Sequence, residues 1–117
     1  MASSRYTAER KFARYALDVR AKLSAGGHEI TARTLDVSEG GVGLISPVEL
    51  PEGSSYTVEF ELPTVQGVFR AAVQGQNRSG FRYGFRFVEV EASSMDLLRK
   101  FQRRWGILAS EKYAARD

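Results

Sequence analysis

Hydrophobic and polar residues alternate with a period of two from Tyr15 onward, which is the pattern of a β-strand with one buried face. The first strand is predicted to point Leu17, Val19, Ala21 and Leu23 inward, and Asp18, Arg20 and Lys22 outward. The turn-forming run Ala25-Gly26-Gly27 ends this strand. A second strand is predicted from about Glu29 to Leu35, and a short one from Val42 to Ser46. Between them, the run from Asp36 to Gly41 is predicted to form a turn.

The same alternation continues through three further segments. Pro47, Pro51 and Gly53 mark the connection that leads into them. Their predicted inward residues are Tyr56, Val58, Phe60 and Leu62, then Phe69, Ala71 and Val73 in a strand near Val68–Gln76, then Phe81, Tyr83, Phe85 and Phe87. Asn77-Arg78-Ser79-Gly80 is predicted to be the hairpin turn between the last two. About six strands joined by short turns, with no helix among them, indicate an antiparallel barrel or sandwich.

A helix is predicted only after the last strand. Ser93, followed by Asp96 three residues later, resembles a capping box that starts a helix. An apolar stripe at helical spacing follows, and its members are Leu97, Leu98, Phe101, Trp105 and Leu108. The stripe is expected to pack against the barrel; a partner or a second copy is the alternative. The predicted class is therefore all-β with a C-terminal helix.

Length and composition narrow the class of protein further. At 117 residues the chain has the size of one domain, and it contains no cysteine. Disulfides, thiolate metal sites and a cysteine nucleophile are thereby excluded, and a cytoplasmic location is expected. No stretch is long and apolar enough to predict a membrane span. The net charge of +3 favours anionic partners.

Positive charge gathers in two segments rather than along the whole chain. The clustered residues are Arg5, Arg10, Lys11 and Arg14 in an N-terminal arm, and Arg99, Lys100, Arg103 and Arg104 near the C-terminus. Arg10 and Arg14 form an R-x-x-x-R spacing. The run from Asp36 to Gly41 reads D-x-S-x-x-G, in which Asp36 and Ser38 are turn-forming residues and Gly41 is conformationally permissive. Either motif by itself is uninformative, since basic arms and polar turns are common.

The two motifs in this order, around six strands and before a helix, resemble the PilZ domain family. Tyr83-Gly84-Phe85-Arg86-Phe87 also resembles a late G-x-x-F strand of that family. Lys11 and Ala13 depart from residues common in the arm, at positions outside the two defining motifs. The resemblance implies a six-stranded antiparallel split barrel, with a flexible arm at 1–14, the barrel at 15–92, and a helix and tail at 93–117.

The resemblance also implies a ligand, the second messenger cyclic di-GMP, bound by Arg10, Arg14, Asp36, Ser38 and Gly41. The chemistry is suitable, because an arginine fork grips a phosphate or the O6/N7 edge of guanine. The Asp36 carboxylate only accepts, so it matches the adjacent N1–H and N2–H₂ donors of guanine, which adenine lacks. Ser38 offers a hydroxyl to a phosphate or base. Gly41 is expected to permit a tight turn or a close approach to the ligand.

The expected mechanism is a ligand-driven ordering of the arm. Ligand between Arg10, Arg14 and the turn at Asp36–Gly41 neutralises the arginines, folds the arm onto the barrel and changes the surface offered to a downstream protein. The chain is expected to be a monomer or homodimer, to need no cofactor or metal beyond its ligand, and to have no catalytic activity. His28, its single histidine, is expected to be an exposed loop residue.

Two other functions remain open at this point. The first is a PilZ-like protein-interaction module that does not bind nucleotide, although all five motif residues are present. The second is a small barrel that binds single-stranded nucleic acid, with Phe69, Tyr83, Phe85 and Phe87 as a stacking platform. Strict alternation favours a core face for these four rings, and nucleic acid is not the expected partner.

Overall fold

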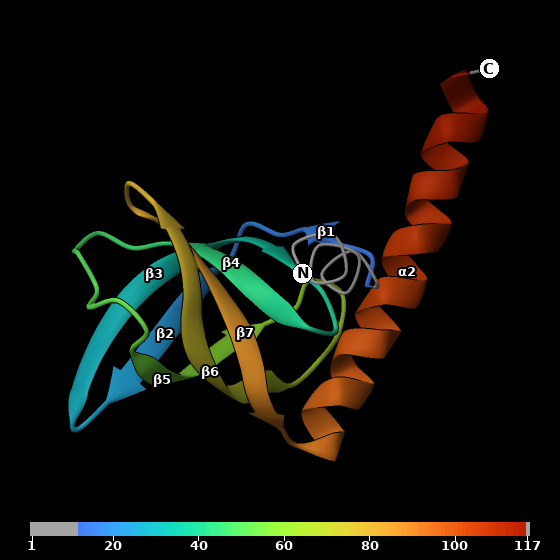
Figure 1. Cartoon of the computed structure of the whole chain (residues 1–117). Helices are drawn as coiled ribbons and strands as arrows, with labels where there is room; N and C mark the ends of the chain where they lie inside the picture. The colour runs from blue at the N-terminus through green and yellow to red at the C-terminus, as the bar shows by residue number, and fades with distance from the viewer. Residues whose placement is uncertain (1–11, 117) are drawn as a thin grey trace, which may run out of the picture.

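The computed structural model describes the backbone of residues 12–116 and the side chains of residues 12–105. Within these described residues, seven strands are followed by one long helix (Figure 1). Their bounds are β1 Tyr15–Ala16, β2 Arg20–Ala25, β3 His28–Val37, β4 Gly41–Ile45, β5 Ser55–Glu61, β6 Val68–Ser79, β7 Arg82–Val90 and α2 Ala92–Arg116.

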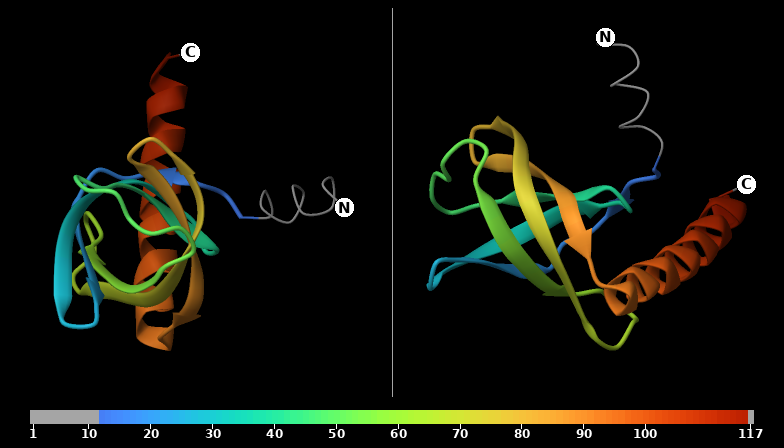
Figure 2. Two further views of the ribbon diagram at one scale, coloured as in Figure 1. Left: turned by 60° about the vertical axis from the view of Figure 1, so that its left-hand side comes forward. Right: turned by 60° about the horizontal axis from the view of Figure 1, so that its bottom comes forward.

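Six of the strands close into an antiparallel barrel, as the sequence predicted. The hydrogen-bonded order is β3-β2-β5-β6-β7-β4, and a further pairing of β4 with β3 closes the ring. The short β1 adds a seventh strand beside the end of β3, where Tyr15 pairs with Val37. Figure 2 shows the barrel along its length and the helix outside it. Closure leaves the six strands without free edges, apart from their frayed ends.

The interior of the barrel is filled by the side chains that the alternation pointed inward. The most enclosed of these are Ala21, Leu23, Val58, Phe60, Leu62, Phe69, Ala71, Val73 and Phe85, and Leu44 of β4 joins them. Gly26 and Gly27 both have positive φ, at 56° and 82°, in the two-residue turn that joins β2 to β3. That conformation matches the right-handed twist of the paired strands, so the glycine pair sets the register of this hairpin.

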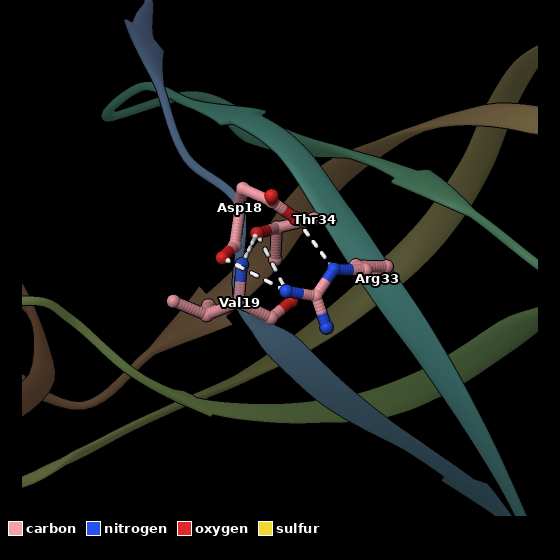
Figure 3. A network of polar contacts seen from close by, with 4 residues as sticks. All are labelled: Asp18, Val19, Arg33 and Thr34. Atoms are coloured by element: carbon pink, nitrogen blue, oxygen red, sulfur yellow. Dashed lines mark hydrogen bonds and ion pairs between the residues drawn. The ribbon is translucent and has the colours of Figure 1, made fainter.

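The first predicted strand is interrupted between β1 and β2. There the side chain of Thr34 takes the place of some backbone hydrogen bonds between the strands. The buried hydroxyl of Thr34 accepts from the backbone N–H of Val19 at 2.8 Å and lies 3.2 Å from the Val19 carbonyl oxygen, to which it can donate (Figure 3). Beside it, Arg33 Nε donates to Asp18 Oδ1 at 2.5 Å. These contacts attach the segment between β1 and β2 to β3, and so hold the chain that follows the arm against the barrel.

Two predicted turns are partly strand. Asp36 belongs to β3, so the turn before β4 is shorter than the run from Asp36 to Gly41. Asn77 belongs to β6, which continues to Ser79, and the hairpin turn lies at Gly80 and Phe81 instead. Phe81 is consequently half exposed rather than inward. Both predictions were wrong because the polar residues that suggested turns pair with glycines on the neighbouring strand.

The helix packs its first half on the barrel, and its last turns extend beyond it (Figures 1 and 2). Leu98 and Phe101 are buried, which confirms that this part of the stripe docks on the barrel, whereas the side chain of Leu108 lies outside the described residues. The predicted cap is displaced: α2 begins at Ala92, so Ser93 is inside its first turn. Ser94 is buried there and accepts from the backbone N–H of Arg70 at 2.9 Å, which ties the helix to β6.

Candidate functional site

A pocket of about 440 Å³ lies on the outer wall of the barrel, where β3, β4, β7 and the end of β6 run side by side. Its floor is formed by outward-facing positions that alternate with core residues such as Val42 and Phe85. The residues that line it are Phe12, Arg14, Leu35, Asp36, Ser38, Gly40, Gly41, Val42, Gly43, Gln76, Asn77, Ser79, Arg82, Tyr83, Gly84, Phe85 and Arg86.

Four of the five site residues predicted from the sequence meet in this pocket. Arg14 approaches from the arm, and Asp36, Ser38 and Gly41 come from the end of β3, the turn and the start of β4. Arg10 lies outside the described residues. The two motifs, which lie more than twenty positions apart in the chain, therefore contribute to a single cavity.

The turn between β3 and β4 is held by its own polar groups. Ser38 Oγ accepts from the backbone N–H of Gly40 at 3.1 Å, and the Ser38 N–H donates to the Gly41 carbonyl at 2.9 Å. The Ser38 hydroxyl keeps its own proton available for a ligand. From the arm, Phe12 lies against Gly40, where a β-carbon would come within 3.1 Å of the Phe12 ring.

The structure gives Gly41 a role in strand packing, while its expected close approach to a ligand stays a prediction. Its φ is not positive, so backbone conformation does not demand glycine there. A β-carbon at Gly41 would instead overlap the Phe85 carbonyl oxygen and lie 3.2 Å from Arg86 Cα. The absence of a side chain lets β4 approach β7 closely, which brings the turn against the pocket floor.

Sequence reasoning missed the second wall of the pocket, formed by β6 and β7. Its polar members are Gln76, Asn77, Ser79, Arg82 and Arg86. On β7 the outward positions read Arg82, Gly84, Arg86, so two cations flank a glycine. The available signal was the period-two pattern itself, since the residues that alternate with a predicted core face must share the opposite face.

The described lining is positively charged, with three arginines and one aspartate. Outside the pocket, four arginines pair with a carboxylate: Arg33, Arg70, Arg78 and Arg99. Glu59, for example, accepts a hydrogen bond from Arg70 Nε and raises the pKa of the Arg70 guanidinium above its ordinary value. Arg14 and Arg82 have no ion-pair partner in the described part of the chain, and Arg86 Nη2 donates only to the neutral Gln74 Oε1, at 2.6 Å. Such a pocket favours an anionic ligand with planar acceptor edges.

Two residues next to the pocket, Tyr15 and Glu39, contact α2. Tyr15 directly follows Arg14, and its ring packs edge-on against Trp105 at 5.4 Å and Phe101 at 6.2 Å between centroids. From the turn, Glu39 pairs with Arg99 at 3.5 Å. The helix therefore contacts one motif of the site directly, through Glu39, and the residue that follows the other motif, through Tyr15.

Comparison with protein-family models places this chain in a known family. The model described as PilZ domain matches residues 8–103, which is most of the chain and includes both motifs. This chain belongs to the PilZ domain family. The resemblance drawn from Arg10, Arg14, Asp36, Ser38 and Gly41 is thereby confirmed at the level of the family. No curated protein matches the chain.

Solved structures of other PilZ proteins share the fold. YcgR from Escherichia coli in complex with c-di-GMP is 24% identical, with a TM-score of 0.75 over 92% of this chain and 50% of that one. The isolated PilZ domain of YcgR with c-di-GMP is 23% identical, with a TM-score of 0.65 over 90% and 97%. The Bacillus subtilis inhibitor of motility, MotI/DgrA, is 16% identical, with a TM-score of 0.66 over 81% and 50%. This PilZ chain thus spans about half the length of MotI and of whole YcgR.

Three other functional features bear on the part of the chain that the structure describes. No group of three or more histidine, aspartate or glutamate side chains there is arranged to hold a metal ion. No helix among those residues is long and apolar enough to cross a membrane. Phe69, Tyr83 and Phe85 are at most 6% exposed, so these rings form core and not a stacking platform for nucleic acid.

Proposed function

We propose that this PilZ chain is a cytoplasmic receptor or adaptor for cyclic di-GMP, and that it has no catalytic role. One observation carries the proposal: Arg14, Asp36, Ser38 and Gly41, from motifs separated in sequence, line one positively charged pocket of about 440 Å³. The two YcgR structures, in which a protein of the same fold is bound to c-di-GMP, support the choice of ligand.

Each residue has a role suited to its chemistry. Arg14, together with Arg10 of the arm, binds phosphate and the O6/N7 edge of guanine through its planar fork. The Asp36 carboxylate accepts from the N1–H and N2–H₂ groups of one guanine. Ser38 donates its hydroxyl proton to a phosphate oxygen while its lone pair continues to brace Gly40.

Isothermal titration calorimetry tests the ligand and the arm together. Wild-type protein is expected to bind cyclic di-GMP, and Arg14→Ala to bind it more weakly because a charge-assisted fork is removed. Thr57→Ala is a matched control, since Thr57 is exposed on β5 and outside the pocket lining. Absence of wild-type binding at tens of micromolar ligand sinks the receptor proposal, whereas unchanged affinity in Arg14→Ala sinks only the role of the arm.

The contacts with α2 suggest how ligand binding could be transmitted to a downstream protein. We propose that ligand binding orders the arm on the barrel and shifts Tyr15 against Trp105, which alters the surface that the helix offers to a downstream protein. Trp105 is the chain's single tryptophan, so its fluorescence reports this contact directly. A ligand-dependent change in emission is expected in wild type and absent in Tyr15→Ala. If the emission is the same with and without saturating ligand, α2 is not the output element.

A further inference from the structure

One row of residues crosses four strands of the pocket floor and has two glycines at its centre. Asp36 on β3 pairs with Gly43 on β4, Gly43 pairs with Gly84 on β7, and Gly84 pairs with Asn77 on β6. Adjacent strands lie about 4.8 Å apart, so at most about 14 Å separates the two outer Cα atoms. The floor between Asp36 and Asn77 is therefore bare backbone.

A β-bulge produces each polar end of this row. The β3 bulge inserts Leu35 between Thr34 and Asp36, and the β6 bulge inserts Gln76 between Gly75 and Asn77. Thr34 faces the core, so an unbroken alternation would bury Asp36 two residues later. The extra residue reverses the facing, and the same holds for Asn77. Bulges of this kind re-aim side chains at binding sites.

Both re-aimed side chains lean over the glycine platform. A β-carbon at Gly43 would lie 2.7 Å from Asp36 Oδ1, and one at Gly84 would lie 2.9 Å from Asn77 Cγ. The platform thus has a carboxylate at one end and a carboxamide at the other. Arg82, two positions before Gly84 on the same face of β7, adds donors beside the carboxamide.

We infer that Asn77 contacts the second purine of the bound cyclic dinucleotide, and that its end of the platform accepts either guanine or adenine. The inference rests on the proposed function. A carboxylate only accepts, so the Asp36 end requires the adjacent donors of guanine. A carboxamide has a donor and an acceptor, and by rotating it pairs with the N1–H/O6 edge of guanine or with the N1/N6–H₂ edge of adenine. The site thus has one strict end and one permissive end.

Calorimetric titration with three cyclic dinucleotides measures the two ends separately. Wild type is expected to bind the hybrid cyclic GMP–AMP within about tenfold of cyclic di-GMP, and cyclic di-AMP about 10- to 100-fold more weakly than the hybrid, because only cyclic di-AMP offers Asp36 no pair of adjacent donors. If the hybrid binds about 100-fold or more weakly than cyclic di-GMP, the inference that the Asn77 end accepts either purine is wrong.

Substitutions at Asn77 test the residue itself, through the ratio of hybrid to cyclic di-GMP affinity. Asn77→Ala is expected to weaken both ligands about fivefold while keeping the ratio, since one hydrogen-bonded pair is lost in each. Asn77→Asp is expected to lower the ratio of hybrid to cyclic di-GMP affinity about tenfold, because a carboxylate at this position discriminates against adenine. The ratio cancels the general cost of an added negative charge.

Outcomes separate this inference from the receptor proposal. If wild type binds cyclic di-GMP and both Asn77 variants match it with every ligand, Asn77 makes no contact and the inference is wrong while the receptor stands. If wild type binds none of the three nucleotides, the receptor proposal fails first. Asn77 is exposed, so both variants are expected to fold, and circular dichroism with Thr57→Ala as reference verifies this.

Discussion

The two walls of the pocket are built by the same devices but are encoded differently. The wall of β3 and β4 consists of a bulge, a glycine-bearing strand and a polar turn, all within the contiguous run from Leu35 to Gly43. The wall of β6 and β7 also has a bulge and a glycine, but its members are split between the end of one strand and the length of the next. The first is visible as a motif, whereas the second becomes a wall only when the two strands pair.

The largest difference between the walls is expected at their glycines. Gly41→Ala places a methyl group against backbone of β7, which cannot move aside, and is expected to lower the free energy of unfolding by about 1–3 kcal/mol and abolish ligand binding. Gly84→Ala meets only the end of the Asn77 side chain, and is expected to cost less than about 1 kcal/mol. Urea unfolding of both variants makes the comparison, and equal destabilisation would contradict it.

Removal of the carboxylate is expected to have the next largest effect, and on binding alone. Asp36→Ala deletes hydrogen bonds between a charged acceptor and the ligand, worth about 1.5–3 kcal/mol, so cyclic di-GMP affinity is expected to fall by about 10- to 150-fold. Titration calorimetry gives the affinity, and thermal unfolding without ligand provides the control. If the variant binds cyclic di-GMP as tightly as wild type does, Asp36 does not contact the guanine base.

A smaller, salt-dependent effect is expected from the other wall. Arg82 lines the pocket without an ion pair among the described residues, so Arg82→Ala is expected to weaken cyclic di-GMP binding severalfold in low salt and less as salt screens its charge. Titrations at two ionic strengths measure the difference. Arg78→Ala is the matched control, because Arg78 is already paired with Glu49 at 3.2 Å and does not line the pocket. A loss that ignores salt would indicate a packing role instead.

The smallest effect is expected outside both walls, in the network at the base of the arm. Asp18→Ala removes an exposed ion pair with Arg33, which is expected to change the free energy of unfolding by about 0.2–1 kcal/mol. Ligand affinity is expected to remain that of wild type, since Thr34 still holds Val19. Chemical denaturation and calorimetry give the two values. A large loss of affinity would show that this ion pair positions Arg14.

Prediction from sequence succeeded where one segment carries its own signal. Leu23, Val58 and Phe69 were placed inside by alternation, and Gly26-Gly27 was placed in a turn, since burial and positive φ are local demands. It failed at Ser93 and Phe81, where the helix start and the hairpin turn lie one to two residues away from the local signal. Element ends are decided by tertiary contacts, here the bond from the Arg70 N–H to Ser94.

The candidate site divides in the same way. The resemblance of the two ordered motifs to the PilZ family was enough to nominate Arg10, Arg14, Asp36, Ser38 and Gly41. The last three were expected side by side, because a short turn keeps its own residues together. Alternation places Arg82 on the outer face of its strand, but only the pairing of β6 with β7 brings it beside Asn77. The outward facing of Asn77 depends in addition on a bulge that no local pattern announces. An extra residue in a strand reverses every facing after it, and only the paired strand shows where it lies.

By itself, then, the sequence predicted about six antiparallel strands with a terminal helix, and its resemblance to the PilZ family predicted the barrel and nominated residues of one wall of the candidate pocket. The tertiary structure alone decided that Asp36 and Asn77 face outward over Gly43 and Gly84, and that Tyr15 and Glu39 join the pocket to α2. The physical reason is that alternation specifies which residues share a face, whereas strand register and helix docking specify which faces meet.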